Sequence, residues 1–304
     1  MPLSPLAFFS CKTKRHIVDI RSAAVFARGS FPGALSVPAA QFDSAPALLI
    51  HLRKKYTSAP IHLIDADGGI ATALTPYDMD CMEGGYNVFQ HWRDNIYTGG
   101  PAIAVVSGKT GCGKTEFLRT LAKKGRQVID LELLANHRGS VFGAFATGQP
   151  AVEQFQFDVL KTWLSFNPDS PVWIEDKGPA LGKLRVPEKL YQKMISANVF
   201  ELDTPFESRL QRIQEEYTGI DKKIFSGYIK KLVNRMGFSA NHKALHFHET
   251  GQTDKCLRLL LDYYDRAYDY LKKSKKVKTK HTITFSACTN EESVRQLEAM
   301  IMSS

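Results

Sequence analysis

The chain has 304 residues and a formal net charge of +9; 43% of its residues are hydrophobic and 23% are charged. This length accommodates two globular domains, and no apolar run approaches the roughly 20 residues that cross a bilayer. The basic residues of the first segment follow its apolar ones, the reverse of a secretory signal, and the five cysteines form no CxxC pair. We therefore expect a cytoplasmic protein without a membrane segment, a disulfide framework or a structural zinc site.

Residues 15–95 have the pattern of a small α/β domain. Strands are expected at 16–20 and 61–64, with a turn at 30–33 and a helix at 45–56 between them. A polar stretch containing glycine follows, and residues 96–100 (IYTGG) are typical of a linker. We therefore place a first domain at residues 1–98.

From Pro101 onward, strands alternate with helices, as is typical of a mostly parallel sheet covered by helices. The expected strands are 102–106, 128–131, 172–175 and 199–203, and the expected helices include 115–124 and 151–166. The helix after residue 203 has a predicted capping box, with Thr204 as N-cap, Pro205 as the first helical residue and Glu207 closing the box. We assign residues 99–221 to this second domain.

Residues 222–304 are predicted to form a basic, helical C-terminal region that completes the second domain. The excess positive charge lies here, since residues 222–280 hold 15 Lys and Arg against 5 Asp and Glu. Such a concentration suits a polyanion such as RNA, although a solvated basic face accounts for the charge equally well.

A phosphate-binding loop is the most specific motif. It comprises Gly108, Lys109, Thr110, Gly111, Cys112, Gly113, Lys114 and Thr115, which match GxxxxGK[ST] at every fixed position. An apolar strand precedes it and a helix follows, so backbone amides and the helix N-terminus can surround an anion. Lys114 is expected to reach the terminal phosphates and Thr115 to ligate Mg²⁺.

Acids at the end of the strand 172–175 provide a second part of this site. Glu175 and Asp176 occupy the strand end at which P-loop folds place the acid that organises the metal. We therefore expect Asp176, or Glu175, to assist in holding Mg²⁺. His137 and Arg138 follow another strand at the same side, where they can contact phosphate or substrate.

Several segments, taken in order, resemble the tRNA 2-selenouridine synthase family. In the second domain these are VIDLELLANHRGSVFG at 128–143, Gln149-Pro150, PVWIED at 171–176 and LLDYYDRAY at 260–268. In the first domain, Asp19-Ile20-Arg21, Phe26, Gly29, Phe31-Pro32-Gly33-Ala34 and Glu83-Gly84-Gly85-Tyr86 resemble the signature of the family's rhodanese domain. The resemblance implies a shortened rhodanese-like α/β domain, followed by a P-loop NTPase-type parallel-sheet α/β domain with a basic helical C-terminal region.

The resemblance also implies an activity. The family modifies wobble 2-thiouridine of tRNA by geranylating its sulfur with geranyl diphosphate, then exchanging the sulfur for selenium from selenophosphate. On this interpretation Lys114 and the loop amides hold the diphosphate, Thr115 and Asp176 organise Mg²⁺ where it is used, and His137 and Arg138 line the site. The partners implied are tRNA and a small diphosphate, with ATP or GTP as the alternative ligand of the loop.

One departure from the family pattern concerns the reactive cysteine of the rhodanese loop, C-x-x-G-G-x-R-S. The matching stretch here is Asp65-Ala-Asp-Gly-Gly-Ile-Ala-Thr72, so Asp65 replaces the cysteine and Ala71 replaces the arginine. A carboxylate carries neither a persulfide nor a perselenide, so we expect selenium transfer through this position to be lost. Cys81 lies in a different place, and we expect it to be an incidental or buried thiol.

Two other readings remain open at this stage. A P-loop kinase or ATPase with a vestigial first domain would use Arg209 and Arg212 to clamp a transferring phosphate. A non-catalytic adaptor would bind nucleotide without turnover and hold a protein partner. The sequence leaves the oligomeric state open.

Overall fold

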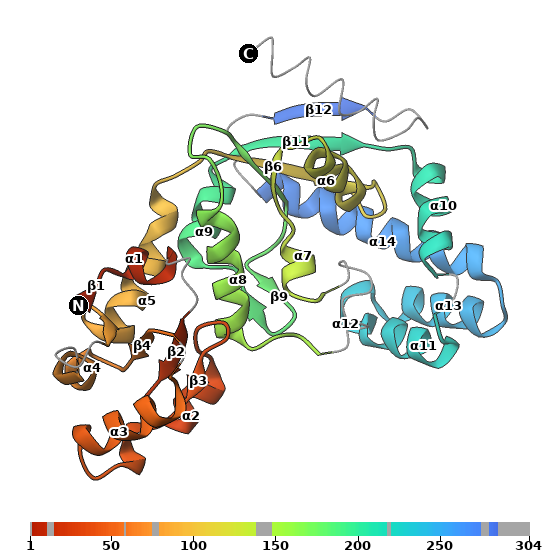
Figure 1. Ribbon diagram of the computed structural model, residues 1–304. Coiled ribbons are helices and arrows are strands. Elements are labelled where there is room, and N and C mark those ends of the chain that lie inside the picture. The colour runs from red at the N-terminus through yellow and green to blue at the C-terminus, as the bar shows by residue number, and fades with distance from the viewer. Residues whose placement is uncertain are drawn as a thin grey trace. The chain divides into compact units, whose positions relative to one another are not determined.

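The computed structural model describes residues 2–10, 15–57, 59–74, 79–137, 148–217, 220–274 and 280–284 (Figure 1). The chain divides into two compact units. Unit 1 comprises Met1–Gly100, Gly148–Ser165 and Pro179–Tyr191, and unit 2 comprises Pro101–Thr147, Phe166–Gly178 and Gln192–Ser304. The predicted domain ranges stay a prediction. The boundaries of the compact units differ from those ranges, because two segments after residue 147 pack with the N-terminal part of the chain.

Unit 1 contains a five-stranded sheet with the order β1-β5-β4-β2-β3, in which every pairing is parallel. Its strands are β1 (Pro2–Leu3), β2 (His16–Asp19), β3 (Leu35–Ser36), β4 (Ile61–Ile64) and β5 (Asp80–Met82). All four residues of β4 are buried, as expected of an apolar central strand that is covered on both faces. The predicted strands at 16–20 and 61–64 are thereby confirmed.

Helices cover this sheet and supply most of the core of unit 1. They are α1 (Pro5–Ser10), α2 (Ala23–Arg28), α3 (Ala45–Lys55), α4 (Gly69–Leu74), α5 (Gly85–Asn95) and α8 (Val152–Leu164), with short 3₁₀ turns η1 (Ala39–Gln41) and η3 (Ile96–Thr98) and a hairpin of β9 (Ala180–Leu181) and β10 (Leu184–Arg185). The predicted helix at 151–166 is confirmed as α8. It packs within unit 1, where the ring centroid of Phe157 lies 4.7 Å from that of Phe31.

Unit 2 contains a second five-stranded parallel sheet, with the order β12-β11-β6-β8-β7. Its strands are β6 (Ile103–Gly108), β7 (Gln127–Ile129), β8 (Val172–Glu175), β11 (Asn198–Asp203) and β12 (Lys280–Thr284). In chain order, β7 and β8 are added on one side of β6, and β11 and β12 are then added on the other. The carboxyl end of β6 is therefore a topological switch point, which is the usual ligand site of such sheets. The predicted α/β class with a P-loop type of sheet is confirmed.

The helices of unit 2 are α6 (Lys114–Lys123), α7 (Leu131–Leu134), α10 (Phe206–Tyr217), α11 (Lys222–Lys231), α12 (Val233–Met236), α13 (Phe238–Glu249) and α14 (Thr253–Ser274), while α9 (Glu188–Ile195) runs from unit 1 into unit 2. Helices α10 to α14 share an apolar core that includes Ile213, Phe225, Ile229 and Leu257. None of the helices in the described ranges combines the length and the apolar character needed to cross a membrane.

Three local predictions for unit 2 were wrong. The strand expected at 128–131 ends at Ile129, because the Asp130 side chain caps α7 by accepting a hydrogen bond from the Leu133 amide at 2.9 Å. The capping box is not formed: α10 begins at Phe206, the Thr204 hydroxyl donates to the Cys112 carbonyl at 3.2 Å, and Glu207 binds Arg258. Finally, residues 280–284 of the supposedly helical C-terminal region form β12, which pairs in parallel with β11.

Candidate phosphate-binding site

The phosphate loop joins β6 to α6 and depends on three glycines with positive φ. Gly108 has φ 143°, Gly111 has φ 77° and Gly113 has φ 89°, conformations that side chains rarely adopt. A Cβ on Gly108 would lie 2.6 Å from the Leu202 carbonyl oxygen, and one on Gly111 would lie 2.9 Å from that of Arg209. The sequence places glycine here because the neighbouring chain leaves no room for a side chain.

Lys114 lies at the mouth of this loop, in the first turn of α6. Its Nζ donates to the carbonyl oxygens of Gly108 at 2.9 Å and Lys109 at 3.2 Å, and it lies 3.8 Å from Glu175 Oε1 at the end of β8. The ammonium is therefore held beside the loop before any anion arrives. Thr115 follows in the same turn and is half-buried.

A chain of alternating charges extends from Lys114 across the end of the sheet. The Lys177 Nζ lies 2.9 Å from Glu175 Oε1 and 2.5 Å from Glu132 Oε1. Burial by itself lowers the pKa of Lys177, but the carboxylates of Glu175 and Glu132 outweigh it, so the pKa is raised. Glu175 is thus shared by two ammonium groups, and the loss of one leaves it paired with the other.

His137 lies at the far end of this charge chain. Its backbone amide donates to the Glu132 carbonyl at 2.9 Å, and its Nδ1 is buried without a hydrogen-bond partner among the described residues. Burial lowers the pKa of His137, the Glu132 carboxylate opposes this, and Lys177 adds to it. Arg138, the other residue predicted there, lies outside the described residues.

Asp176 follows Glu175 and is fixed against β6. Its amide donates to the Val106 carbonyl at 2.8 Å, and its carboxylate accepts a hydrogen bond from the Ser107 hydroxyl at 3.3 Å. The Ser107 hydroxyl is also 2.7 Å from the hydroxyl of Tyr268, which donates to Glu201 Oε1 at 3.1 Å. Burial raises the pKa of Tyr268 to about 12. Tyr268 therefore acts here as a hydrogen-bonding residue between strand ends.

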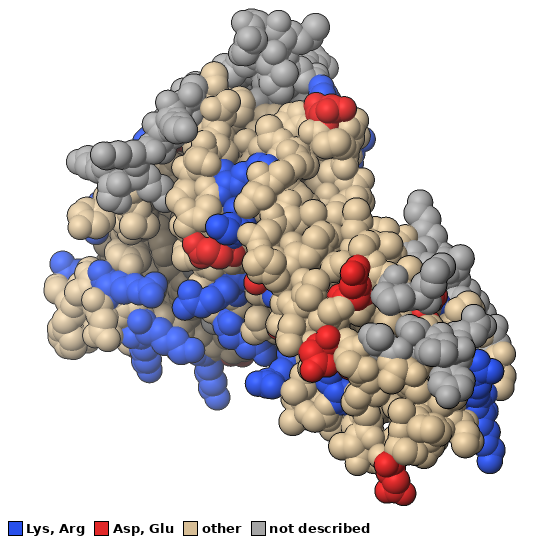
Figure 2. Space-filling model, turned by 90° about the vertical axis from the view of Figure 1, so that its left-hand side faces the viewer, with Lys and Arg blue, Asp and Glu red and all other residues tan. Residues whose placement is uncertain are grey.

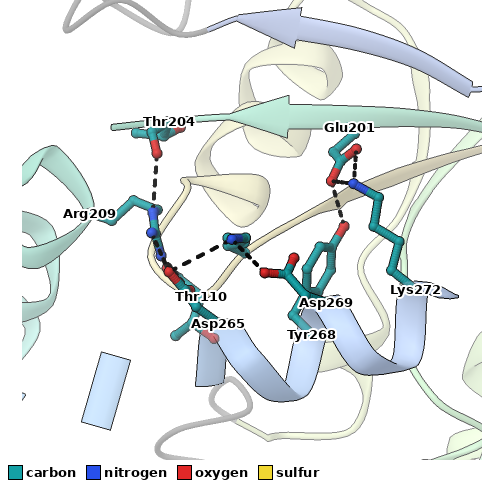
Figure 3. Close-up of polar contacts among 9 residues, drawn as sticks. Thr110, Glu201, Thr204, Arg209, Asp265, Tyr268, Asp269 and Lys272 are labelled. Carbon is teal, nitrogen blue, oxygen red and sulfur yellow. Dashed lines mark hydrogen bonds and ion pairs between the residues drawn. The ribbon is translucent and has the colours of Figure 1, made fainter. Parts of the chain in front are cut away.

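Helix α14 supplies a second set of contacts, which hold the outer side of the loop (Figure 3). Asp265 accepts from both Nη atoms of Arg209, at 2.8 and 2.6 Å, and Arg209 Nη1 also donates to the Thr110 carbonyl at 3.1 Å. Lys109 Nζ lies 3.0 Å from Asp269, and Lys272 binds Glu201 of β11 at 2.8 Å. Acidic side chains of α14 thus neutralise cations on and around the loop.

Arg212, the other arginine of the kinase reading, also binds the loop from outside. Its Nη1 donates to the Gly111 carbonyl at 2.8 Å, and its Nη2 lies 3.7 Å from Glu116. Arg209 and Arg212 both hold carbonyl oxygens, so each stabilises the shape of the loop.

The predicted magnesium ligands meet a limited donor set. Within the described ranges, no group of three or more His, Cys, Asp or Glu side chains is arranged to hold a metal ion. A magnesium ion bound with phosphates needs only one or two protein oxygens, because it keeps most of its waters. Thr115 and Asp176 fit that smaller requirement, and their assignment stays a prediction.

In unit 1, hydrogen bonds and packing contacts from the chain itself occupy the loop after β4. Asp65 is 4% exposed, and its Oδ1 accepts a hydrogen bond from the Gly68 amide at 2.7 Å. A Cβ on Gly85 would lie 2.4 Å from the Gly68 nitrogen, so the segment at 83–86 packs directly on this loop. Nearby lies a cavity of about 370 Å³ whose lining includes Arg21, Tyr86 and Glu153. Cys81 is fully buried in β5.

Comparison with known proteins supports the resemblance to the tRNA 2-selenouridine synthases. A family model described as the tRNA 2-selenouridine synthase AAA domain matches residues 101–246. The chain is 35% identical to a tRNA 2-selenouridine synthase of Shewanella piezotolerans over 198 residues, which is 60% of this chain and 52% of the relative. Residues 101–246 are thus similar to the AAA domain of the tRNA 2-selenouridine synthases.

Two further tRNA 2-selenouridine synthases match over more of the chain. The Shewanella woodyi protein is 26% identical over 74% of this chain and 70% of its own length, and the Psychromonas ingrahamii protein is 26% identical over 84% and 88%. The longer of these matches is too extensive to be confined to unit 2. The predicted resemblance to this family, and with it the prediction of an enzyme, is confirmed.

The sequence located the phosphate loop, but it missed most of the side chains around it. Lys177 directly follows the strand-end acids Glu175 and Asp176, and this position in the sequence could have indicated that it lies at the site. Glu132, Glu201 and Asp265 carry no local signal, because each meets its partner only in the folded chain. The roles of the predicted site residues, including Cys112 as part of the loop, stay predictions.

Proposed function

We propose that this chain is a tRNA-modifying transferase that geranylates the sulfur of wobble 2-thiouridine, with the phosphate loop holding the diphosphate of geranyl diphosphate. The observation that carries the proposal is the position of Lys114, held at the loop mouth by two carbonyl oxygens and Glu175. Preorganised cations and amides of this kind stabilise a departing diphosphate. A tRNA substrate also implies a cytoplasmic location.

In this reaction the sulfur of the base attacks the first carbon of the geranyl chain. A carbon–sulfur bond forms, the carbon–oxygen bond to the diphosphate breaks, and the electron pair leaves with the diphosphate. The base also releases its N3 proton. His137 is our candidate acceptor, because burial lowers its pKa and so leaves the ring neutral near pH 7. Thr115 and Asp176 would hold Mg²⁺ on the diphosphate.

We further propose that selenium-for-sulfur exchange is lost. The buried carboxylate of Asp65 already accepts a hydrogen bond from the amide of Gly68, and a carboxylate forms no bond to selenium of the kind a thiolate forms. Selenophosphate is then no substrate of this chain. Because the nucleophile of the geranyl transfer is the tRNA sulfur, losing the cysteine leaves that reaction intact.

The test is a mass analysis of nucleosides from tRNA that contains 2-thiouridine. The tRNA is incubated with the protein and geranyl diphosphate, with and without selenophosphate, beside a Lys114→Ala variant. A geranylated nucleoside that disappears with the variant supports the proposal. Conversion to selenouridine would overturn the loss of selenium exchange. ATP turnover without any change in the nucleoside would instead favour a kinase or ATPase.

A further inference from the structure

Helix α13 exposes a row of aromatic rings to solvent. Phe238 is 77% exposed, and the side chains of His242 and His246 are exposed as well. The three residues are four positions apart, so they lie along one side of the helix. The rings of Phe238 and His242 are stacked, with centroids 6.0 Å apart and planes at 26°.

This row is not required for the core of unit 2. The opposite side of α13 is already packed, with Asn241 and Ala244 buried and Asn241 Nδ2 donating to the Ile229 carbonyl at 2.5 Å. Single exposed apolar side chains are common on protein surfaces, so the feature that favours a binding role is the whole row, in which Phe238 is followed by two exposed imidazole rings.

The positive charge of the helices that include this row indicates which class of partner the row binds. Residues 222–249, which include α11, α12 and α13, hold six Lys and Arg and a single acid, Glu249. Among the residues that the structure describes, Lys230, Lys231, Arg235 and Lys243 of this segment form no ion pair. In α14, by contrast, Arg258, Arg266 and Lys272 each bind a carboxylate. Lys and Arg side chains also gather on the face shown in Figure 2, which is turned to the left-hand side of Figure 1 and does not single out α13.

We infer that the ring row of α13, together with the unpaired cations of α11 to α13, is a stacking platform for unpaired bases of RNA. Every base has a π-face, so rings beside free cations bind single-stranded or looped RNA with little dependence on sequence. This inference rests on the proposed function, in which the substrate is tRNA, and it assigns tRNA contact to these helices (Figure 1).

The test is tRNA binding by fluorescence anisotropy over a range of salt concentrations. A variant that combines Phe238→Ala, His242→Ala and His246→Ala is expected to bind about 10- to 100-fold more weakly, since each stacked base contributes about 5-fold or more. The slope of log affinity against log salt is expected to stay unchanged. Lys230→Ala with Lys231→Ala should instead reduce that slope by about 1.4 to 1.8.

Matched variants and the wild type separate the outcomes. Phe238→Trp keeps a ring and should bind like wild type, as should Ile50→Ala, which removes a 67% exposed apolar side chain from α3. Phe238→Ala alone replaces the triple variant if the latter fails to fold by circular dichroism. Unchanged tRNA binding by the ring variant overturns the platform and leaves the proposed function standing. Loss of self-association instead of RNA binding also overturns it. A wild type that binds no tRNA overturns both.

Discussion

Each of the two units has a glycine-containing loop after a buried parallel strand. The two loops differ in the charged side chain that lies at each of them. In unit 1 the loop after β4 begins with Asp65, and its carboxylate accepts the hydrogen bond of the Gly68 amide. In unit 2 the loop after β6 leads into α6, and a lysine stands at its mouth. A loop satisfied by its own anion has little left to offer an external one, whereas a loop bordered by a cation attracts it. The Asp65 carboxylate at the end of β4 and the Lys114 ammonium in the first turn of α6 thus set the two loops apart.

The second difference lies in what surrounds each loop. The phosphate loop is held from outside by Arg209, Arg212 and the acids of α14, whose partners lie far away in the sequence. The unit 1 loop is held by the neighbouring turn at 83–86, whose Tyr86 amide donates to the Asp65 carbonyl at 2.9 Å. Both loops therefore depend on tertiary contacts, but the partners of the phosphate loop lie farther away in the sequence.

The largest effect is expected from Lys114→Ala, which removes the cation that distinguishes the two loops. Geranyl transfer should fall by roughly 100- to 1,000-fold, as when a preorganised electrostatic contact is lost. The rate of geranylated nucleoside formation measures it. Lys123→Ala, in the last turn of the same helix, is the control and should retain the activity.

Asp265→Ala should destabilise unit 2 by about 3 kcal/mol, because it leaves the guanidinium of Arg209, 4% exposed, without its carboxylate. Urea denaturation measures the change. Asp262→Ala, which removes an exposed pair with Arg266 on the same helix, should cost less than about 1 kcal/mol. Equal losses in the two variants would show that α14 does not stabilise the loop through Asp265.

Gly108→Ala tests whether the loop needs glycine for space as well as for conformation. The new Cβ would lie 2.6 Å from the Leu202 carbonyl oxygen at φ 143°, and we expect a loss of about 2–3 kcal/mol in unfolding free energy. Gly125→Ala has φ 78° but nothing within 4 Å of its Cβ, so it measures conformational strain alone, about 1 kcal/mol. If the two variants lose the same stability, the close approach to β11 has no energetic weight.

Asp65→Ala examines the self-filled loop of unit 1. Leaving the buried Gly68 amide unsatisfied should cost about 1–2 kcal/mol in urea denaturation, while geranyl transfer stays at the wild-type rate. Asp67→Ala removes an exposed acceptor of the Gly69 amide and serves as the control, with an effect of about 0.5 kcal/mol or less. A fall in transfer rate would mean that the loops of the two units are coupled.

The smallest effect concerns the pH dependence that His137 contributes. Because burial lowers the pKa of His137 in the folded chain, the unfolded chain takes up a proton first as the pH falls below about 6.5. The folded state resists that proton, so stability declines with falling pH through this window. Urea midpoints at pH 7.5 and 5.5 should therefore separate more for wild type than for His137→Gln, and equal separations would refute this origin.

The sequence by itself determined the features that depend on neighbouring residues. The buried strand 103–108, the glycines of the loop and Lys114 all lie within a dozen residues, and their pattern needs no distant partner. The amphipathic repeat of α14 and the apolar strands β4 and β8 were predictable for the same reason. The replacement of cysteine by Asp65 was visible once the surrounding glycines were recognised.

Only the tertiary structure decided which side chains complete the site. Ser107 and Tyr268 are 161 residues apart in sequence, and Lys109 and Asp269 are 160 apart, yet both pairs form hydrogen bonds. It also decided that α8 packs in unit 1 and that Thr204 binds the phosphate loop instead of capping α10. Local pattern specifies an element, but burial and charge pairing depend on which elements the chain brings together, and this is why the residues around Lys114 could not be predicted from sequence.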